Sequence, residues 1–301
     1  MDYKAPLETY NGKVVEVVLG KGDAALKVGG ENVLPLHFFE GEIQNKPRVA
    51  LEVYDIDPQN WAEWVRQPFE GVMDDPIAWA KKCVEYGAEI VCIRLMSTDP
   101  AGDNGPADKA AETVKKVVEA VKVPVIVYGS GDETKDIEVL TKVAEMCKGD
   151  NLLLGPVVKE NFEPISKAAL ENGHCIIAQT PLDINLEKEL NVKLLKTFPP
   201  DKIVIDPLSS GLGYGVEYSF TIMERTKQIG IIFGDATMQM PIIADLGGEN
   251  WKTKQAKESK EQGILWETTA ATSLLLAGAN ILVLRHPESL ALIKEEIDGK
   301  M

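Results

Sequence analysis

The stretch Ile203–Gly215, IVIDPLSSGLGYG, indicates the fold that we expect for this chain. Residues 203–206 form a short apolar run that ends in Asp206, which is typical of a strand buried on both faces. Pro207 ends the strand, because proline cannot donate to a sheet ladder. The serines and glycines that follow form a loop that can approach a ligand closely, since glycine has no side chain. A helix pattern comes next, over 216–230.

The same order of apolar strand, polar strand end, loop and helix recurs along the chain. Strands are predicted over 49–56, 89–96, 124–130, 151–157, 174–179, 203–208, 242–246 and 280–286. Helices are predicted over 76–87, 106–121, 134–147, 161–172, 183–191, 216–230, 262–277 and 287–298. Eight such units in about 250 residues predict an α/β fold, the closed (β/α)8 TIM barrel. A doubly wound open sheet is the alternative, but the GxGxxG motif that would support it does not follow the first strand.

Residues 1–48 precede this repeating pattern. Short strands are predicted over 14–19 and 25–36, with glycine-containing turns beside them. We expect a β-hairpin that plugs one end of the barrel. The predicted domains are therefore an N-terminal hairpin extension over 1–48 and the barrel over 49–301.

The bulk composition is that of an acidic globular protein. The chain has 301 residues, a net charge of −15 and a pI of about 4.8, which argues against nucleic acid and anionic membranes as partners. The amino terminus MDYKAPLETY has no signal-peptide pattern, and no apolar run reaches the roughly 18 residues of a spanning helix. Without CxxC spacing, the cysteines are interpreted as packing groups in a reducing cytoplasm. They are Cys83, Cys92, Cys147 and Cys175.

Polar residues gather near the predicted carboxyl ends of the strands, where barrels place their functional groups. They are Asp55, Asp57, Arg94, Ser97, Thr98, Asp99, Tyr128, Ser130, Gln179, Thr180, Asp206, Ser209, Asp245 and His286. A Schiff-base lysine is not expected, because Lys202 lies at the other end of its strand. Glu52 and Arg94 lie on neighbouring strands and are predicted to pair inside the barrel.

Two alternatives stay open at this rim. Asp206, Asp245 and His286 follow three successive strands, so they could hold a hard metal ion, or the carboxylates could cap loop amides. The long loops after the first and seventh strands carry tryptophans, which indicate either a flat ligand or partner, or lid helices with a buried tryptophan.

Four motifs match, in order, a family that we recognise. They are CIRLMSTDPAG (92–102), PVIVYGSGDETKD (124–136), LLLGPVVKENFEPI (152–165) and IVIDPLSSGLGYGVEYS (203–219). From about residue 34 to its end, the chain resembles the small subunit of the corrinoid iron–sulfur protein, whose archaeal counterpart is the delta subunit of acetyl-CoA decarbonylase/synthase.

The resemblance implies a (β/α)8 barrel that acts as a non-catalytic methyl-carrier subunit. It implies a heterodimer with a large subunit that carries a [4Fe–4S] cluster and a cobalamin, with the corrinoid shared between that subunit and the barrel mouth. Further implied partners are a methyltetrahydrofolate methyltransferase, acetyl-CoA synthase and a reductive activator of the corrinoid. The alternative is a stand-alone methyltransferase that binds methyltetrahydrofolate. Against it, the pair Gln179-Thr180 stands where related pterin methyltransferases have an asparagine.

Under this resemblance, loops at the carboxyl ends of the strands would form the wall that faces the corrin. The residues expected there are Ser97, Thr98, Tyr128, Ser130, Ser209, Gly211, Thr237, Met238 and His286. They are expected to contact amide side chains of the corrin by hydrogen bonds, and none is expected to act as an acid or a base.

Overall fold

The structure, a computed structural model, describes residues 6–35, 37 and 39–300. In this part of the chain eight parallel strands form one sheet, in the order β8-β7-β6-β5-β4-β3-β10-β9. They are β3 (Arg48–Tyr54), β4 (Ile90–Arg94), β5 (Val125–Tyr128), β6 (Leu153–Val157), β7 (Cys175–Gln179), β8 (Ile203–Asp206), β9 (Ile243–Asp245) and β10 (Ile281–Leu284). A parallel bridge between Ile205 and Ile242 joins β8 to β9. The sheet therefore closes on itself, which confirms the predicted barrel and makes the open-sheet alternative wrong.

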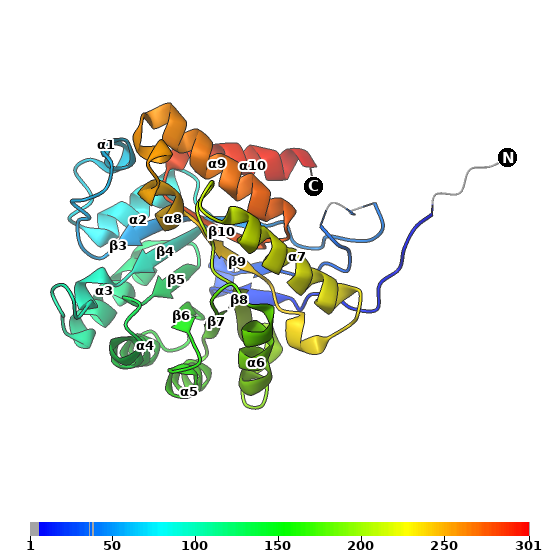
Figure 1. Ribbon diagram of the computed structural model, residues 1–301. Helices are drawn as coiled ribbons and strands as arrows, with labels where there is room; N and C mark the ends of the chain where they lie inside the picture. Colours follow the sequence, from blue (N-terminus) through cyan, green and yellow to red (C-terminus); the bar gives the residue numbers. More distant parts are fainter. Residues whose placement is uncertain (1–5, 36, 38, 301) are drawn as a thin grey trace.

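Helices surround the strands, as Figure 1 shows. The predicted helices are confirmed as α2 (Pro76–Glu85), α3 (Ala107–Ala120), α4 (Glu133–Met146), α5 (Phe162–Asn172), α6 (Ile184–Leu194), α7 (Val216–Ile231), α9 (Lys260–Leu276) and α10 (Pro287–Lys300). Asp75, Asp132 and Asp183 cap three of them by accepting hydrogen bonds from first-turn N–H groups. The apolar faces of the helices pack on the outward side chains of the strands and form the main core.

Short helical segments lie in the connecting loops. They are α1 (Glu63–Arg66), α8 (Gly247–Lys252), and the 3-10 turns η1 (Gly22–Ala24), η2 (Gln67–Phe69), η3 (Met96–Thr98), η4 (Pro200–Lys202), η5 (Ala236–Met238) and η6 (Gln255–Lys257). Helices α1 and α8 lie in the two long rim loops that follow β3 and β9, which places extra structure at the carboxyl end of the barrel.

The hairpin predicted ahead of the barrel is present, and it covers the amino end. Strand β1 (Val17–Leu19) pairs antiparallel with β2 (Leu26–Val28). Buried side chains of both strands pack on the residues inside the barrel. The Asn151 side-chain amide, just before β6, donates to the Val18 and Gly20 carbonyls at 2.8 and 3.0 Å. The hairpin therefore acts as a plug at the end opposite the carboxyl rim.

The extension is less regular than the sequence predicts. The second strand, expected over 25–36, is confirmed only at β2, and residue 36 lies outside the described residues. The division of the chain into an extension over 1–48 and a barrel over 49–301 stays a prediction.

Side chains inside the barrel follow the alternation of each strand, because successive residues point to opposite faces. The lower layers are mainly apolar and include all of Ala50, Ile90, Cys92, Ile126, Leu153, Cys175, Ile177, Val204, Ile243, Ile281 and Val283. Continuing the same alternation toward the carboxyl ends gives Glu52, Tyr54, Arg94, Tyr128, Gln179, Asp206, Asp245 and Arg285. The barrel mouth therefore has a polar floor. The four cysteines are free and buried, which confirms their interpretation as packing groups.

Candidate functional site

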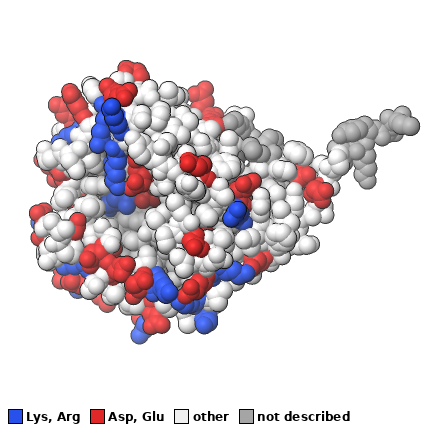
Figure 2. Space-filling view, in the orientation of Figure 1, with Lys and Arg blue, Asp and Glu red and all other residues white. Residues whose placement is uncertain are grey.

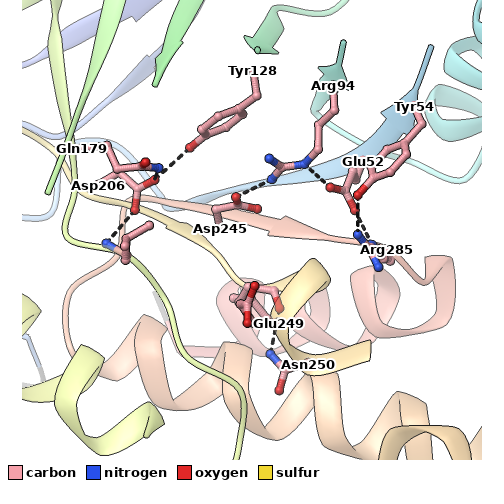
Figure 3. Close-up of polar contacts among 12 residues, drawn as sticks. Glu52, Tyr54, Arg94, Tyr128, Gln179, Asp206, Asp245, Glu249, Asn250 and Arg285 are labelled. Atoms are coloured by element: carbon pink, nitrogen blue, oxygen red, sulfur yellow. Dashed lines mark hydrogen bonds and ion pairs between the residues drawn. The ribbon is translucent and has the colours of Figure 1, made fainter. Parts of the chain in front are cut away.

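Four charged side chains form one network across the barrel mouth (Figure 3). Arg94 pairs with both Glu52 and Asp245, and Arg285 also pairs with Glu52. The Arg285 guanidinium donates to the Tyr54 hydroxyl at 2.8 Å. Burial alone would raise the pKa of Glu52, but the two guanidiniums hold it below its ordinary value. The predicted Glu52–Arg94 pair is confirmed, and Arg285 is a further partner that the sequence patterns did not single out.

A second polar cluster surrounds Asp206 at the end of β8. Its carboxylate accepts hydrogen bonds from the Tyr128 hydroxyl at 3.1 Å, the Gln179 amide at 2.8 Å and the Leu208 backbone N–H at 2.9 Å. Burial, together with the charge of Asp245, raises the pKa of Asp206 to about 6. Asp206 caps its loop as predicted, and it also anchors a side chain from the neighbouring strand β7 and one from β5, across the barrel mouth.

The two clusters touch through a cation–π contact. The guanidinium carbon of Arg94 lies 4.5 Å from the centre of the Tyr128 ring. Asp206 is fully buried, and both of its oxygens accept hydrogen bonds from this chain. A ligand could therefore reach this carboxylate only by displacing one of these donors. Contacts between side chains of this chain thus stabilise the floor of the mouth.

The loop after β8 has an uncommon backbone. Leu208 has a φ of +65° and a side chain that is 37% exposed. A left-handed conformation costs a residue with a Cβ roughly 1 kcal/mol, and the hydrogen bond to Asp206 helps to hold it. The next residue, Ser209, is buried, and its hydroxyl has no partner among the described residues. A Cβ on Gly211 would lie 2.9 Å from the Glu249 carbonyl oxygen, so only glycine lets this loop approach α8.

Tryptophans in the long rim loops and on α9 mainly connect the loops at the carboxyl end of the barrel. Trp251 on α8 is buried in a cluster with Val65 of α1. The Trp266 indole donates to the Leu212 carbonyl at 3.0 Å, and the Leu212 N–H donates to Asn250 at 3.1 Å. Of the two interpretations of the rim aromatics, the lid helix with a buried tryptophan is confirmed for Trp251.

Three of the residues predicted for the site stabilise rim loops. The Ser97 N–H donates to Asp55 at 2.9 Å, and the Ser130 N–H donates to Asp136 at 2.8 Å. Thr98 is fully buried, and its hydroxyl donates to a backbone carbonyl three residues earlier at 2.7 Å. Ser97 and Ser130 are half-buried at the rim, so they are closer to solvent than Thr98 is.

Three other predicted positions need correction. Thr237 and Met238 lie in η5, between α7 and β9. Loops that precede strands lie at the amino end of a barrel, so the expected place on the carboxyl rim is wrong for both. His286 is fully buried with its ring centre 5.9 Å from that of Trp251, and burial lowers its pKa to about 4. His286 follows the inward-facing Arg285, so its side chain points to the outer side of the strands. The expectation that His286 lines the mouth is therefore also wrong.

The metal alternative finds no support at this rim. Within the described ranges, no three His, Cys, Asp or Glu side chains are grouped so that they could hold a metal ion. Asp206 and Asp245 engage donors of this chain, and His286 packs on the outer side of the strands. The loop-capping role is therefore confirmed for Asp206, whereas Asp245 serves as the partner of Arg94.

Surface charge and helix length bear on possible partners. On the face shown in Figure 2, acidic and basic side chains are interspersed, and no broad blue area is visible there. The chain as a whole carries a net charge of −15. Among the helices of the described residues, none combines the length and the apolarity that crossing a bilayer requires.

Comparison with known proteins gives a consistent family match. The family model described as CO dehydrogenase/acetyl-CoA synthase delta subunit matches residues 16–295. A protein of Archaeoglobus fulgidus named acetyl-CoA decarbonylase/synthase complex subunit delta is 38% identical over 96% of this chain and 68% of its own length. A protein of the same name from Methanopyrus kandleri is 35% identical over 93% of this chain and 71% of its own length. The chain thus spans about two thirds of the length of these relatives.

Solved structures with a similar architecture include dihydropteroate synthases. The enzyme of Xanthomonas albilineans has a TM-score of 0.62 at 14% identity, with 95% of this chain and 100% of that chain covered. The enzyme of Vibrio fischeri has a TM-score of 0.62 at 15% identity, with 94% and 97% covered. At such low identity the similarity shows the barrel fold alone.

Proposed function

The chain belongs to the CO dehydrogenase/acetyl-CoA synthase delta subunit family, and from this membership we propose that it is the barrel subunit of a corrinoid methyl carrier. In this proposal a large partner subunit holds the corrinoid and a [4Fe–4S] cluster, and the barrel mouth covers the corrinoid. A separate methyltransferase supplies the methyl group from methyltetrahydrofolate, and acetyl-CoA synthase accepts it. A reductive activator keeps the corrinoid in its working state.

The observation that carries this proposal is the bonding of the acidic groups in the mouth. Glu52 and Asp245 are paired with arginines, and Asp206 accepts three hydrogen bonds from this chain. A general base must reach the proton that it removes. Each of these carboxylates is already engaged by a neighbour, and only one oxygen of Asp245 is without a partner among the described residues. The arrangement supports a role in binding and covering a reactive group that another subunit holds.

The side chains at the rim fit such a ligand. A corrinoid has a broad apolar ring edged by uncharged amide arms, and its cobalt carries the methyl group when it is bound. The hydroxyls of Thr180 and Ser209 are buried without a partner among the described residues, so each would bond to an amide once its loop moves enough to expose it. Leu208 and Tyr214, at 37% and 58% exposure on the loop after β8, can pack on an apolar ring.

In the proposed mechanism this chain orients its ligand and excludes water, which protects a reactive intermediate. Ser97, Ser130 and Ser209 remain the proposed hydrogen-bonding contacts, with Gly211 keeping the loop after β8 close to α8. Tyr128 and Thr98 lie behind them and support the wall. None of these residues has to gain or lose a proton.

Co-purification with the native large subunit tests the proposal. We expect the pair to contain cobalt and iron and to show a corrinoid spectrum, whereas the isolated chain should be colourless. Calorimetry of the isolated chain with methyltetrahydrofolate tests the alternative. Tight folate binding without a second subunit would favour the stand-alone methyltransferase and contradict the carrier role.

A further inference from the structure

A buried cluster of polar side chains lies outside the barrel mouth, where α6, α7 and η5 meet. Glu187 and Asn191, one turn apart on α6, are 1% and 0% exposed. The hydroxyl of Thr226 on α7 donates to the Oε1 atom of Glu187 at 2.8 Å. The side-chain amide of Asn191 donates to the backbone carbonyl of Thr237 in η5 at 3.0 Å. These two residues of α6 therefore connect the helix to both neighbouring elements.

The side-chain oxygen of Asn191 needs a hydrogen-bond donor. Its Nδ2 atom must be the one that faces Thr237, because a backbone carbonyl can only accept a hydrogen bond. The position of Oδ1 follows from this assignment, and Oδ1 has no partner among the described residues. Buried acceptors in folded proteins are nearly always paired, so a donor close to Asn191 has to be identified.

The second oxygen of Glu187 can supply that donor. Oε2 is buried, and it has no partner in the described ranges either. Residues four positions apart lie on the same face of a helix, and the side chain of the later one leans back toward the earlier one. Glu187 and Asn191 are thus neighbours in one buried space. Two acceptors would leave each other unsatisfied, whereas a proton on Oε2 makes it a donor to Oδ1 and satisfies both atoms.

The groups around Glu187 favour its protonated form. From α7 it meets the uncharged Thr226, and η5 contributes a backbone carbonyl to the cluster. The charge that acts on Glu187 comes from Asp206 of β8 and is negative. The adjacent Lys188 pairs with Asp235 at 2.6 Å instead. Burial and the charge of Asp206 raise the pKa of Glu187 to about 8, in agreement with this arrangement.

We propose that the carboxyl proton of Glu187 forms a hydrogen bond to Asn191 and thereby clamps η5 onto α6, and that loss of this proton to solvent releases the clamp. The hydrogen bond fixes the amide group that holds Thr237. The clamp also acts on the amino-terminal segment, because the Val15 N–H donates to the carbonyl of Gln239, directly after η5, at 2.6 Å. The inference goes beyond the proposed function and does not depend on a ligand in the mouth.

Glu187→Gln and Glu187→Met test the clamp, because both new side chains are neutral and similar in size. The amide of glutamine can donate to Asn191 at every pH, whereas methionine has no donor. Hydrogen exchange of the Val15 amide in the whole chain is followed from pH 6 to pH 9 and corrected for base catalysis. In the wild type the protection of this amide should fall about three- to tenfold, as expected for the loss of one hydrogen bond. In both variants it should stay nearly constant, at a higher level in Glu187→Gln than in Glu187→Met.

A second measurement detects the proton directly. Carbon NMR of the Glu187 carboxyl in the wild type should show the acid form at pH 6, and a carboxylate at that pH would overturn the inference. The inference also fails if the protection of Val15 changes no more in the wild type than in Glu187→Gln, or if the two variants protect Val15 equally. The first two criteria need only the wild type and Glu187→Gln, so they hold even where Glu187→Met does not fold. No corrinoid or partner subunit enters these measurements, so their outcome is separate from that of the proposed function.

Discussion

Glu187 should make the stability of this protein depend on pH. It lies buried between α6 and α7, where the Thr226 hydroxyl donates to one of its oxygens at 2.8 Å. The other oxygen has no partner among the described residues, nor has the side-chain oxygen of Asn191, one turn further along α6. Burial raises the pKa of Glu187 from 4.5 to about 8, and the charge of Asp206 contributes in the same direction. The folded chain therefore holds this carboxyl in its neutral form at pH 7.

The sign and size of the effect follow from proton linkage. The folded-state pKa is the higher one, so the folded chain binds more protons than the unfolded chain between the two values. The free energy of unfolding is then highest below about pH 4.5 and falls as the pH rises toward about 8. For these pKa values the contribution of Glu187 falls by about 2 kcal/mol between pH 5 and pH 7.

Glu187→Gln removes this dependence, because an amide stays neutral at every pH and can still accept from Thr226. Urea denaturation at pH 5, 6 and 7 measures the free energy of unfolding. We expect the variant to gain about 2 kcal/mol relative to the wild type between pH 5 and pH 7. The control is Glu189→Gln on the same helix, whose carboxyl has a pKa lowered by its contact with Lys193. A gap between wild type and Glu187→Gln that stays constant with pH would refute the reasoning.

Three further predictions concern other parts of the chain. Gly211→Val should push the loop after β8 away from α8; limited proteolysis should then cut this loop faster, and an unchanged cleavage rate would contradict the close approach. Lys227→Met should destabilise the chain by about 3–5 kcal/mol in urea denaturation, because it leaves the buried carboxylate of Glu31 without its ion pair. The double variant with Glu31→Gln should recover much of that loss, and no recovery would show that the pair is not the cause. Tyr128→Phe removes a hydrogen bond that lowers the pKa of Asp206. The pKa of this carboxyl, measured by carbon NMR, should therefore be higher in the variant than in the wild type. An equal or lower pKa would contradict the hydrogen bond.

Much of the barrel could be predicted from its apolar strands, because each is short, buried and followed by a helix with a clear start. The side chains that form the polar floor of the mouth could also have been predicted, because successive residues of a strand point to opposite faces. Val283 points into the barrel, so alternation places Arg285 inside and His286 outside. The sequence analysis included His286 because it is a polar residue at the end of the last predicted strand, and it did not take the direction of the side chain into account.

One further feature could have been predicted from the sequence, and two required the three-dimensional structure. The misplacement of Thr237 and Met238 could have been avoided, since the strand predicted over 242–246 follows them and loops before strands lie at the amino end. The left-handed backbone of Leu208 has no sequence signal, because glycine or asparagine is the usual residue there. The unpaired hydroxyl of Thr180 depends on contacts between loops that are far apart in sequence.

In the proposed function, the barrel mouth shelters a corrinoid that a partner subunit holds. The most direct test measures how fast the reduced corrinoid of the large subunit is oxidised in air-saturated buffer, with and without this chain. We expect markedly slower oxidation in the complex, and slower oxidation with the wild type than with Leu208→Gly. Equal rates with and without the chain would contradict it.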